Sequence, residues 1–277
     1  MRRYLKQLSD LQTKHRQAPI VVAGDVLDSW RECPALINFL LVHMPTVYAV
    51  PGNHDCKHGN INDLDKTAYW TLVEAKKIIH LDAYIPVDLG RVTLVGFPWG
   101  FPLQSIEEPI ASIHVAVVHD YIWSKNAGHH PKAKESQHWK AQRAKLKNFD
   151  VALFGDNHTG FLIESKTKGM PHIFNAGTFF RRKIDEISYK PHVGLLHADG
   201  TVSRHYLDTS EDVFLDTRKA DELTGMDISK LIEEFERIGG EIVSYGESLM
   251  QFLSANNVDN AVARIIRKVI EQQRSGK

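Results

Sequence analysis

Four short apolar segments of the chain are each followed at once by polar side chains of the kinds that bind metal ions. PIVVA precedes Gly24 and Asp25, TVYAV precedes Asn53, His54 and Asp55, HVAVV precedes His119 and Asp120, and VALF precedes Asp156 and His158. Carboxylate, amide and imidazole ligands without a thiolate indicate a site for Mn, Fe or Zn rather than a structural cysteine-type zinc site. Two such ions about 3.5 to 4 Å apart can turn a bound water into hydroxide and clamp a phosphoryl group. The pattern therefore predicts a two-metal site for phosphate-ester hydrolysis, with His54 as the general acid.

The single pieces of this pattern are less specific than their combination. A Gly-Asp pair after a strand is a common turn, and one histidine at a strand end is more often a hydrogen-bonded core residue than a ligand. The run GNHD at 52–55 is more specific, because Asn, His and Asp are poor strand formers and serve no packing purpose after an apolar run. We therefore interpret the four segments together as one metal site.

Buried strands are needed to position these side chains. Short apolar runs that are rich in β-branched residues predict these strands. The runs are 19–24, 46–50, 92–97, 114–118, 151–154, 172–174 and 193–196. Apolar residues at helical spacing follow the first two runs, at 33–44 and 67–80. Alternating strands and helices predict an α/β domain, in which ligands bind at the carboxyl ends of the strands.

The pattern changes after about residue 205. Two amphipathic stretches, 228–238 and 258–270, replace the strands, with Gly239 and Gly240 between them. We therefore expect a catalytic domain at 1–205 and a C-terminal helical extension at 206–277.

The composition of the chain limits its expected partners and cellular compartment. The chain has 34 basic and 34 acidic residues, so attraction to a polyanion must come from a local patch. Cys33 and Cys56 are the only cysteines, which argues against a disulfide framework and favours a reducing, cytoplasmic setting. The sequence has neither a signal-peptide pattern nor a membrane-length apolar run, so we expect no membrane partner.

The polar segments resemble the calcineurin-like metallophosphoesterase superfamily, whose motifs are D-x-H, G-D-x-x-D, G-N-H-D/E, a strand-end His and G-H-x-H. Four of the five occur in order within residues 18–205. The resemblance implies a metallophosphoesterase-type β-sandwich flanked by helices and two divalent metal ions. It also implies that Asp25 bridges the ions, that Asn53 and His119 hold the second, that His158 completes the first and that His54 is catalytic.

The first motif, D-x-H, is absent from this sequence. Only Asp25 and His158 would then hold the first ion, so this half of the site is expected to be incomplete and the native protein to begin further upstream. Asp10 and His15 do not replace the missing pair, because they lie in a helical stretch and not after an apolar run.

The last motif also departs from the family pattern, because Asp156 stands where the family has its first histidine. A carboxylate here can be a direct ligand, which favours a hard ion such as Mn. Alternatively it orients His119 from outside the ligand shell.

Two further segments, 24–34 and 175–196, resemble the SbcD-type DNA repair exonucleases. This resemblance implies DNA as substrate and an SMC-like ATPase as partner. A homodimer is a further expectation for the assembly. Arg181 and Arg182 are predicted to bind substrate phosphate, although ordinary surface charges would look the same. The stretch 125–147 holds seven basic residues against Glu135 alone, which indicates either a phosphate-binding patch or a solvated helix face.

The prediction is therefore a metal-dependent DNA exonuclease or endonuclease that uses metal-bound hydroxide. One alternative is a phosphatase or small-molecule phosphodiesterase on the same scaffold. Another is a non-catalytic binding module that lacks the first metal.

Overall fold

The computed structural model describes residues 1–107, 113–125, 127–181 and 186–213. The predicted helical stretches at 228–238 and 258–270 lie outside these residues, as does Arg182. Within the described part of the chain, no helix combines the length and apolar character needed to cross a membrane.

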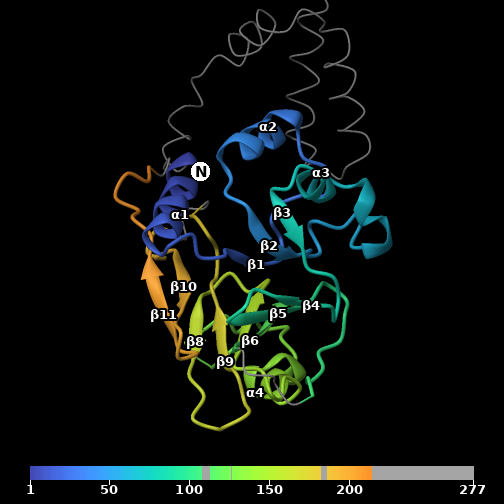
Figure 1. Ribbon diagram of the computed structural model, residues 1–277, viewed down its shortest axis with the longest axis vertical. Helices are drawn as coiled ribbons and strands as arrows, with labels where there is room; N and C mark the ends of the chain where they lie inside the picture. Colours follow the sequence, from blue (N-terminus) through green and yellow to red (C-terminus); the bar gives the residue numbers. More distant parts are fainter. Residues whose placement is uncertain (108–112, 126, 182–185, 214–277) are drawn as a thin grey trace, which may run out of the picture. The chain divides into compact units, whose positions relative to one another are not determined.

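Helices and strands alternate up to His80, and strands predominate in the described chain after it (Figure 1). The helices are α1 (Arg2–Lys14), α2 (Pro34–His43), α3 (Ala68–Glu74) and α4 (Trp139–Arg143), with 3-10 helices η1 (Ile61–Lys66) and η2 (Glu135–Gln137). The strands are β1 (Val21–Ala23), β2 (Val47–Val50), β3 (Ile78–His80), β4 (Pro86–Asp88), β5 (Val92–Phe97), β6 (Ile113–His119), β7 (Val151–Gly155), β8 (Phe161–Ile163), β9 (His172–Asn175), β10 (His192–Leu196) and β11 (Val202–Tyr206). Each of the seven predicted strands is present.

The strands form a small parallel sheet, a larger mixed sheet and a hairpin. The small sheet has the order β1-β2-β3, and the large one has the order β4-β5-β6-β7-β9-β8. In the large sheet β5, β6, β7 and β9 are parallel, whereas the outer strands β4 and β8 pair antiparallel to their neighbours. The mixed α/β architecture confirms the predicted fold class.

The small parallel sheet and the large mixed sheet pack on each other through buried side chains. Strand β6 shows why: Val115 and Val117 point into the layer shared with β1 and β2, while Ala116 and Val118 point to the opposite face. This period-2 alternation of apolar residues on both faces is what a strand buried on both sides requires. The layer between the sheets therefore fixes the carboxyl ends of β1, β6 and β7 close to one another.

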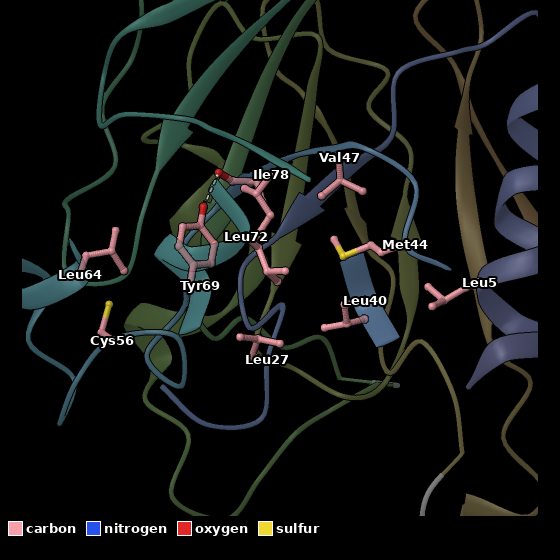
Figure 2. Close-up of a cluster of buried hydrophobic side chains, with 11 residues drawn as sticks. Leu5, Leu27, Leu40, Met44, Val47, Cys56, Leu64, Tyr69, Leu72 and Ile78 are labelled. Carbon is pink, nitrogen blue, oxygen red and sulfur yellow. Dashed lines mark hydrogen bonds between the residues drawn. The ribbon is translucent and has the colours of Figure 1, made fainter. Parts of the chain in front are cut away.

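A second buried cluster lies between the small sheet and helices α1, α2 and α3 (Figure 2). Leu72 and Tyr69 of α3 are fully buried there, and the Tyr69 hydroxyl donates to the Ala49 carbonyl at 3.0 Å. Helix α1 contributes Leu5 to this cluster. The small sheet is thus covered on one face by helices and on the other by the large sheet.

One predicted helix is shorter than expected. Residues 67–80 were predicted as a single helix, but α3 ends at Glu74 and Ile78–His80 form β3. Lys76 adopts a φ of 57°, which ends the helix, and the following isoleucine pair extends the small sheet beside β2. Pairing with a buried parallel strand outweighs the helical spacing of the sequence.

Candidate metal centre

Three predicted ligands meet at the carboxyl ends of three strands. Asp25 follows β1, His119 is the last residue of β6, and Asp156 follows β7. One ligand atom from each lies within 4.8 Å of the other two. Because β6 and β7 are parallel neighbours that pair His119 with Gly155, their ends are held together by the sheet itself. The structure therefore brings a carboxylate pair and an imidazole to one point.

His119 is oriented for metal binding by a backbone hydrogen bond. Its side chain is buried, and Nδ1 lies 2.7 Å from the Ala23 carbonyl oxygen, which can only accept, so Nδ1 is the donor. Nε2 then faces Asn53 Oδ1 at 3.0 Å and Asp25 Oδ1 at 3.5 Å. Nε2 and these two oxygens therefore converge on one point, which is an arrangement of donor atoms suited to a metal ion. Asn53 Oδ1 thus lies beside the cluster, and its role as a metal ligand stays a prediction.

Both carboxylate ligands stand on unusual backbone. Asp25 has a φ of 49° and Asp156 a φ of 82°, in the left-handed region that side chains other than glycine rarely adopt. Such conformations cost of order 1–3 kcal/mol and concentrate at functional sites. Burial raises the pKa of Asp156; the charge of His119 lowers it, and that of Asp25 raises it further. Backbone strain and crowded negative charge both point to a site that a divalent cation completes.

Glycines leave room for these ligands. A Cβ at Gly52 would lie 2.1 Å from Asp25 Oδ1, and one at Gly155 would lie 2.0 Å from the Ala23 carbonyl oxygen. A Cβ at Gly24 would lie 2.1 Å from His119 Nδ1. The glycines of the sequence pattern therefore allow the backbone approach on which the site depends.

Asp55 holds two of the loops together and was not among the predicted site residues. Its carboxylate is fully buried and accepts hydrogen bonds from the backbone N–H groups of Val26, Leu27 and Gly52 at 3.2, 3.0 and 2.9 Å. Burial raises its pKa to about 7, although these N–H groups oppose the shift. Asp55 thus ties the loop that carries Asp25 to the loop that carries Asn53.

His54 is placed at the open side of the cluster. Its side chain is exposed, its backbone N–H donates to Asp25 Oδ1 at 3.0 Å, and its Nδ1 lies 2.8 Å from the Asp28 carbonyl oxygen. The bond to that carbonyl raises the pKa of His54 above its usual value, which keeps the ring protonated nearer neutral pH. A protonated, exposed imidazole beside the cluster is what a general acid requires.

A comparison with protein-family models matches residues 1–160 to the calcineurin-like phosphoesterases. The chain belongs to this family. The phosphoesterase is therefore a metal-dependent hydrolase of phosphate esters, and the match covers every predicted metal ligand. A search of the curated proteins found no match.

The donor set of the phosphoesterase fits a divalent metal ion. Asp25, Asn53, His119 and Asp156 supply oxygen and imidazole nitrogen without a thiolate, the ligands that Mn, Fe and Zn accept. Such an ion supplies an activated water and neutralises charge on the phosphoryl oxygens.

His158 is exposed and does not belong to the group of ligand atoms that Asp25, His119 and Asp156 bring within 4.8 Å of one another. Its charge lowers the pKa of Asp156, whereas burial, the largest effect, raises it. The loop that carries it is held from two sides. Asn157 donates to the Ile122 carbonyl at 2.6 Å, and Asn175 donates to the carbonyls of Asn157 and Thr159 at 2.7 and 3.0 Å. These two asparagines support the loop and were not predicted as site residues.

Arg181 is engaged with the protein itself. Its Nε and one terminal nitrogen contact Asp212 at 2.9 and 2.8 Å, and it also donates to the carbonyls of Ile187 and Thr209. Asp212 in turn contacts Arg3 and Tyr4 of α1. These contacts give Arg181 a role in holding α1 to the segment after β11, and its contact with substrate phosphate stays a prediction.

Proposed function

We propose that this phosphoesterase hydrolyses the phosphodiester bonds of DNA, as an exonuclease or an endonuclease, with manganese as its metal. The observation that carries the proposal is the segment 125–147, which follows His119 on the chain. None of its seven basic side chains forms an ion pair with a carboxylate of the described residues. Unpaired cations attract a polyanion, and each one that meets a phosphate releases a counterion.

The exposure of His54 agrees with a large substrate. A polymer cannot enter a closed cavity, whereas an exposed acid can reach the leaving oxygen of a strand lying on the surface. Because Nδ1 of His54 bonds to the Asp28 carbonyl, a proton on Nε2 is the one that would be available to the leaving group. Asp25 and Asp156 would hold the metal, and Asp55 would keep their loops in place.

The test compares substrates with the same preparation. Linear duplex DNA with Mn²⁺ should release nucleotides or fragments, and the His54→Gln variant should lose this activity while remaining folded. Hydrolysis of bis(p-nitrophenyl) phosphate without any cleavage of DNA would overturn the nuclease proposal and favour a small-molecule phosphodiesterase. No hydrolysis of either substrate with any of Mn²⁺, Fe²⁺ or Zn²⁺ would favour a non-catalytic binding module.

We further propose a cytoplasmic protein that acts with an SMC-like ATPase and as a homodimer. The resemblance of segments 24–34 and 175–196 to SbcD-type exonucleases supports the ATPase partner. Light scattering of the purified chain tests the dimer, and co-purification with an ATPase of this class tests the partner.

A further inference from the structure

A pocket of about 580 Å³ lies beside the segments that follow two of the metal ligands. It is lined by Ser124, Lys125 and Ala127, which follow β6, by the segment around the start of α4, by strand β8 and by one side chain of β11. Strand β8 begins three residues after His158. Part of the pocket is therefore built on the segments that follow β6 and β7, the strands whose ends carry His119 and Asp156.

Among the described residues, three cations and no carboxylate line the pocket. The cations are Lys125, Lys140 and Arg204. All three side chains are exposed, and none forms an ion pair with an acid of the described residues. Arg204 comes from β11, far along the chain from the two lysines, so the fold and not the local sequence brings the charges together.

Apolar side chains line the pocket as well. Phe161, Leu162 and Ile163 of β8 line it, and Phe161 is buried. Trp139 also lines it, and its ring lies 5.6 Å from Lys140 Nζ, a cation–π contact that restricts the ammonium group. A cleft with one sign of charge and low-dielectric walls concentrates the field and attracts a counter-ion.

We propose that this pocket binds a phosphate group of the nucleic-acid substrate away from the bond that is cut, with Lys125, Lys140 and Arg204 as its counter-charges. The inference rests on the proposed function for the identity of the ligand. A pocket of this volume is of the size that holds small ligands, so one nucleotide of a strand fits it. Within the basic segment, Lys125 and Lys140 should therefore contribute more to the affinity for a strand than the lysines outside the pocket.

The test measures binding of a fluorescein-labelled single-stranded DNA oligonucleotide to the full chain by anisotropy in EDTA, which prevents hydrolysis. The Lys125→Gln/Lys140→Gln variant should bind about 25-fold more weakly in about 0.1 M salt, and its salt slope should fall by about 1.4, because each phosphate contact on a single strand contributes about 0.7. The Arg204→Gln variant should bind about fivefold more weakly for the same reason.

The matched control is Lys132→Gln/Lys147→Gln, which removes two exposed lysines of the same segment that do not line the pocket. It should change affinity less than twofold. Equal weakening by the control, or no effect of Arg204→Gln, would overturn the pocket and leave a diffuse patch. Thermal melting of each variant should match that of the unmodified chain, since exposed positions are changed.

Failure of the pocket and failure of the proposed function give different results. A chain that hydrolyses bis(p-nitrophenyl) phosphate but does not bind the oligonucleotide refutes the pocket and not the metal centre. A chain whose variants follow the predicted order but which never cleaves DNA supports the pocket and refutes the nuclease. An oligonucleotide with an uncharged methylphosphonate backbone should not bind, and equal binding of it would refute phosphate recognition.

Discussion

Replacing Gly52 by alanine tests whether close backbone approach builds the metal centre. An added Cβ would lie 2.1 Å from Asp25 Oδ1, 2.4 Å from the backbone nitrogen of Asp25 and 2.7 Å from His119 Cε1. Contacts of a Cβ below about 3.0 Å are essentially never observed. Gly52 does not have a positive φ, so the substitution acts through this overlap and not through backbone strain. Asp25 and the loop that carries it must therefore move by roughly 1 Å.

The magnitude follows from that displacement. A misplacement of about 1 Å at a catalytic site can lower the rate about 100-fold, and overpacking costs about 1–3 kcal/mol of stability. We expect Gly52→Ala to lower kcat/KM for bis(p-nitrophenyl) phosphate about 100-fold with Mn²⁺. The free energy of unfolding in urea should fall by about 1–3 kcal/mol.

Gly90→Ala is the control that separates the site from the fold. Gly90 has a φ of 86° with nothing within 4 Å of an added Cβ, so alanine there strains the backbone without touching the site. This strain costs roughly 1–2 kcal/mol and should leave kcat/KM unchanged. Activity of Gly52→Ala within about fivefold of the unmodified chain would refute the argument that Gly52 makes room for Asp25.

Three further predictions concern titratable groups. His54→Gln should lower kcat by a factor of about 10²–10⁴. The rate of the unmodified chain should decline at alkaline pH, because His54 must be protonated to act as an acid and the bond to the Asp28 carbonyl raises its pKa. A pH–rate profile should show that the variant has lost this decline. Burial raises the pKa of Asp55 to about 7 in the folded protein, compared with 3.8 in the unfolded chain. Between these two pH values the Asp55 carboxyl is protonated in the folded protein and ionised in the unfolded chain. The unfolding free energy in EDTA should then fall by up to about 4 kcal/mol as pH rises from 4 to above 7, and Asp55→Asn should remove this dependence in urea melts. Burial raises the pKa of Asp212, but hydrogen bonds from Tyr4 and Arg181 outweigh burial, so the net pKa is lowered. The contribution of Asp212 to the free energy of unfolding is therefore present above pH 3.8 and is lost as the pH falls below that value. In urea melts, Asp212→Asn should cost about 1–3 kcal/mol at pH 7 and little at pH 2.

The strands that end in ligands could be predicted from the sequence because they are buried on both faces. Val115 to Val118 and Val151 to Phe154 are continuous apolar runs. The polar residues that follow these runs do not fit a buried strand, which indicates that they belong to a site. Asp25, His119 and Asp156 could therefore be placed together before any coordinates. Strand β3 could not, because its two isoleucines continue the spacing of a helix and only the neighbouring strand β2 makes them extended.

Residues whose roles depend on contacts between distant loops were beyond reach of the sequence. Asp55 was visible in the run GNHD, but its bonds to Val26 and Leu27 depend on how two loops meet. Arg204 stands in an ordinary amphipathic hairpin, and its place beside Lys125 follows from the fold alone. Arg181 was predicted as a substrate-binding residue from its position after a strand. That position in the sequence does not reveal its ion pair with Asp212.

Titration with Mn²⁺ followed by electron paramagnetic resonance tests the central claim most directly, because it reports metal binding at the cluster of Asp25, His119 and Asp156 without reference to a substrate. We predict that the chain binds Mn²⁺, that His119→Gln loses a site, and that His197→Gln, which changes an exposed histidine of the hairpin, does not. Absence of binding, or equal binding by the His119→Gln variant, would contradict the account.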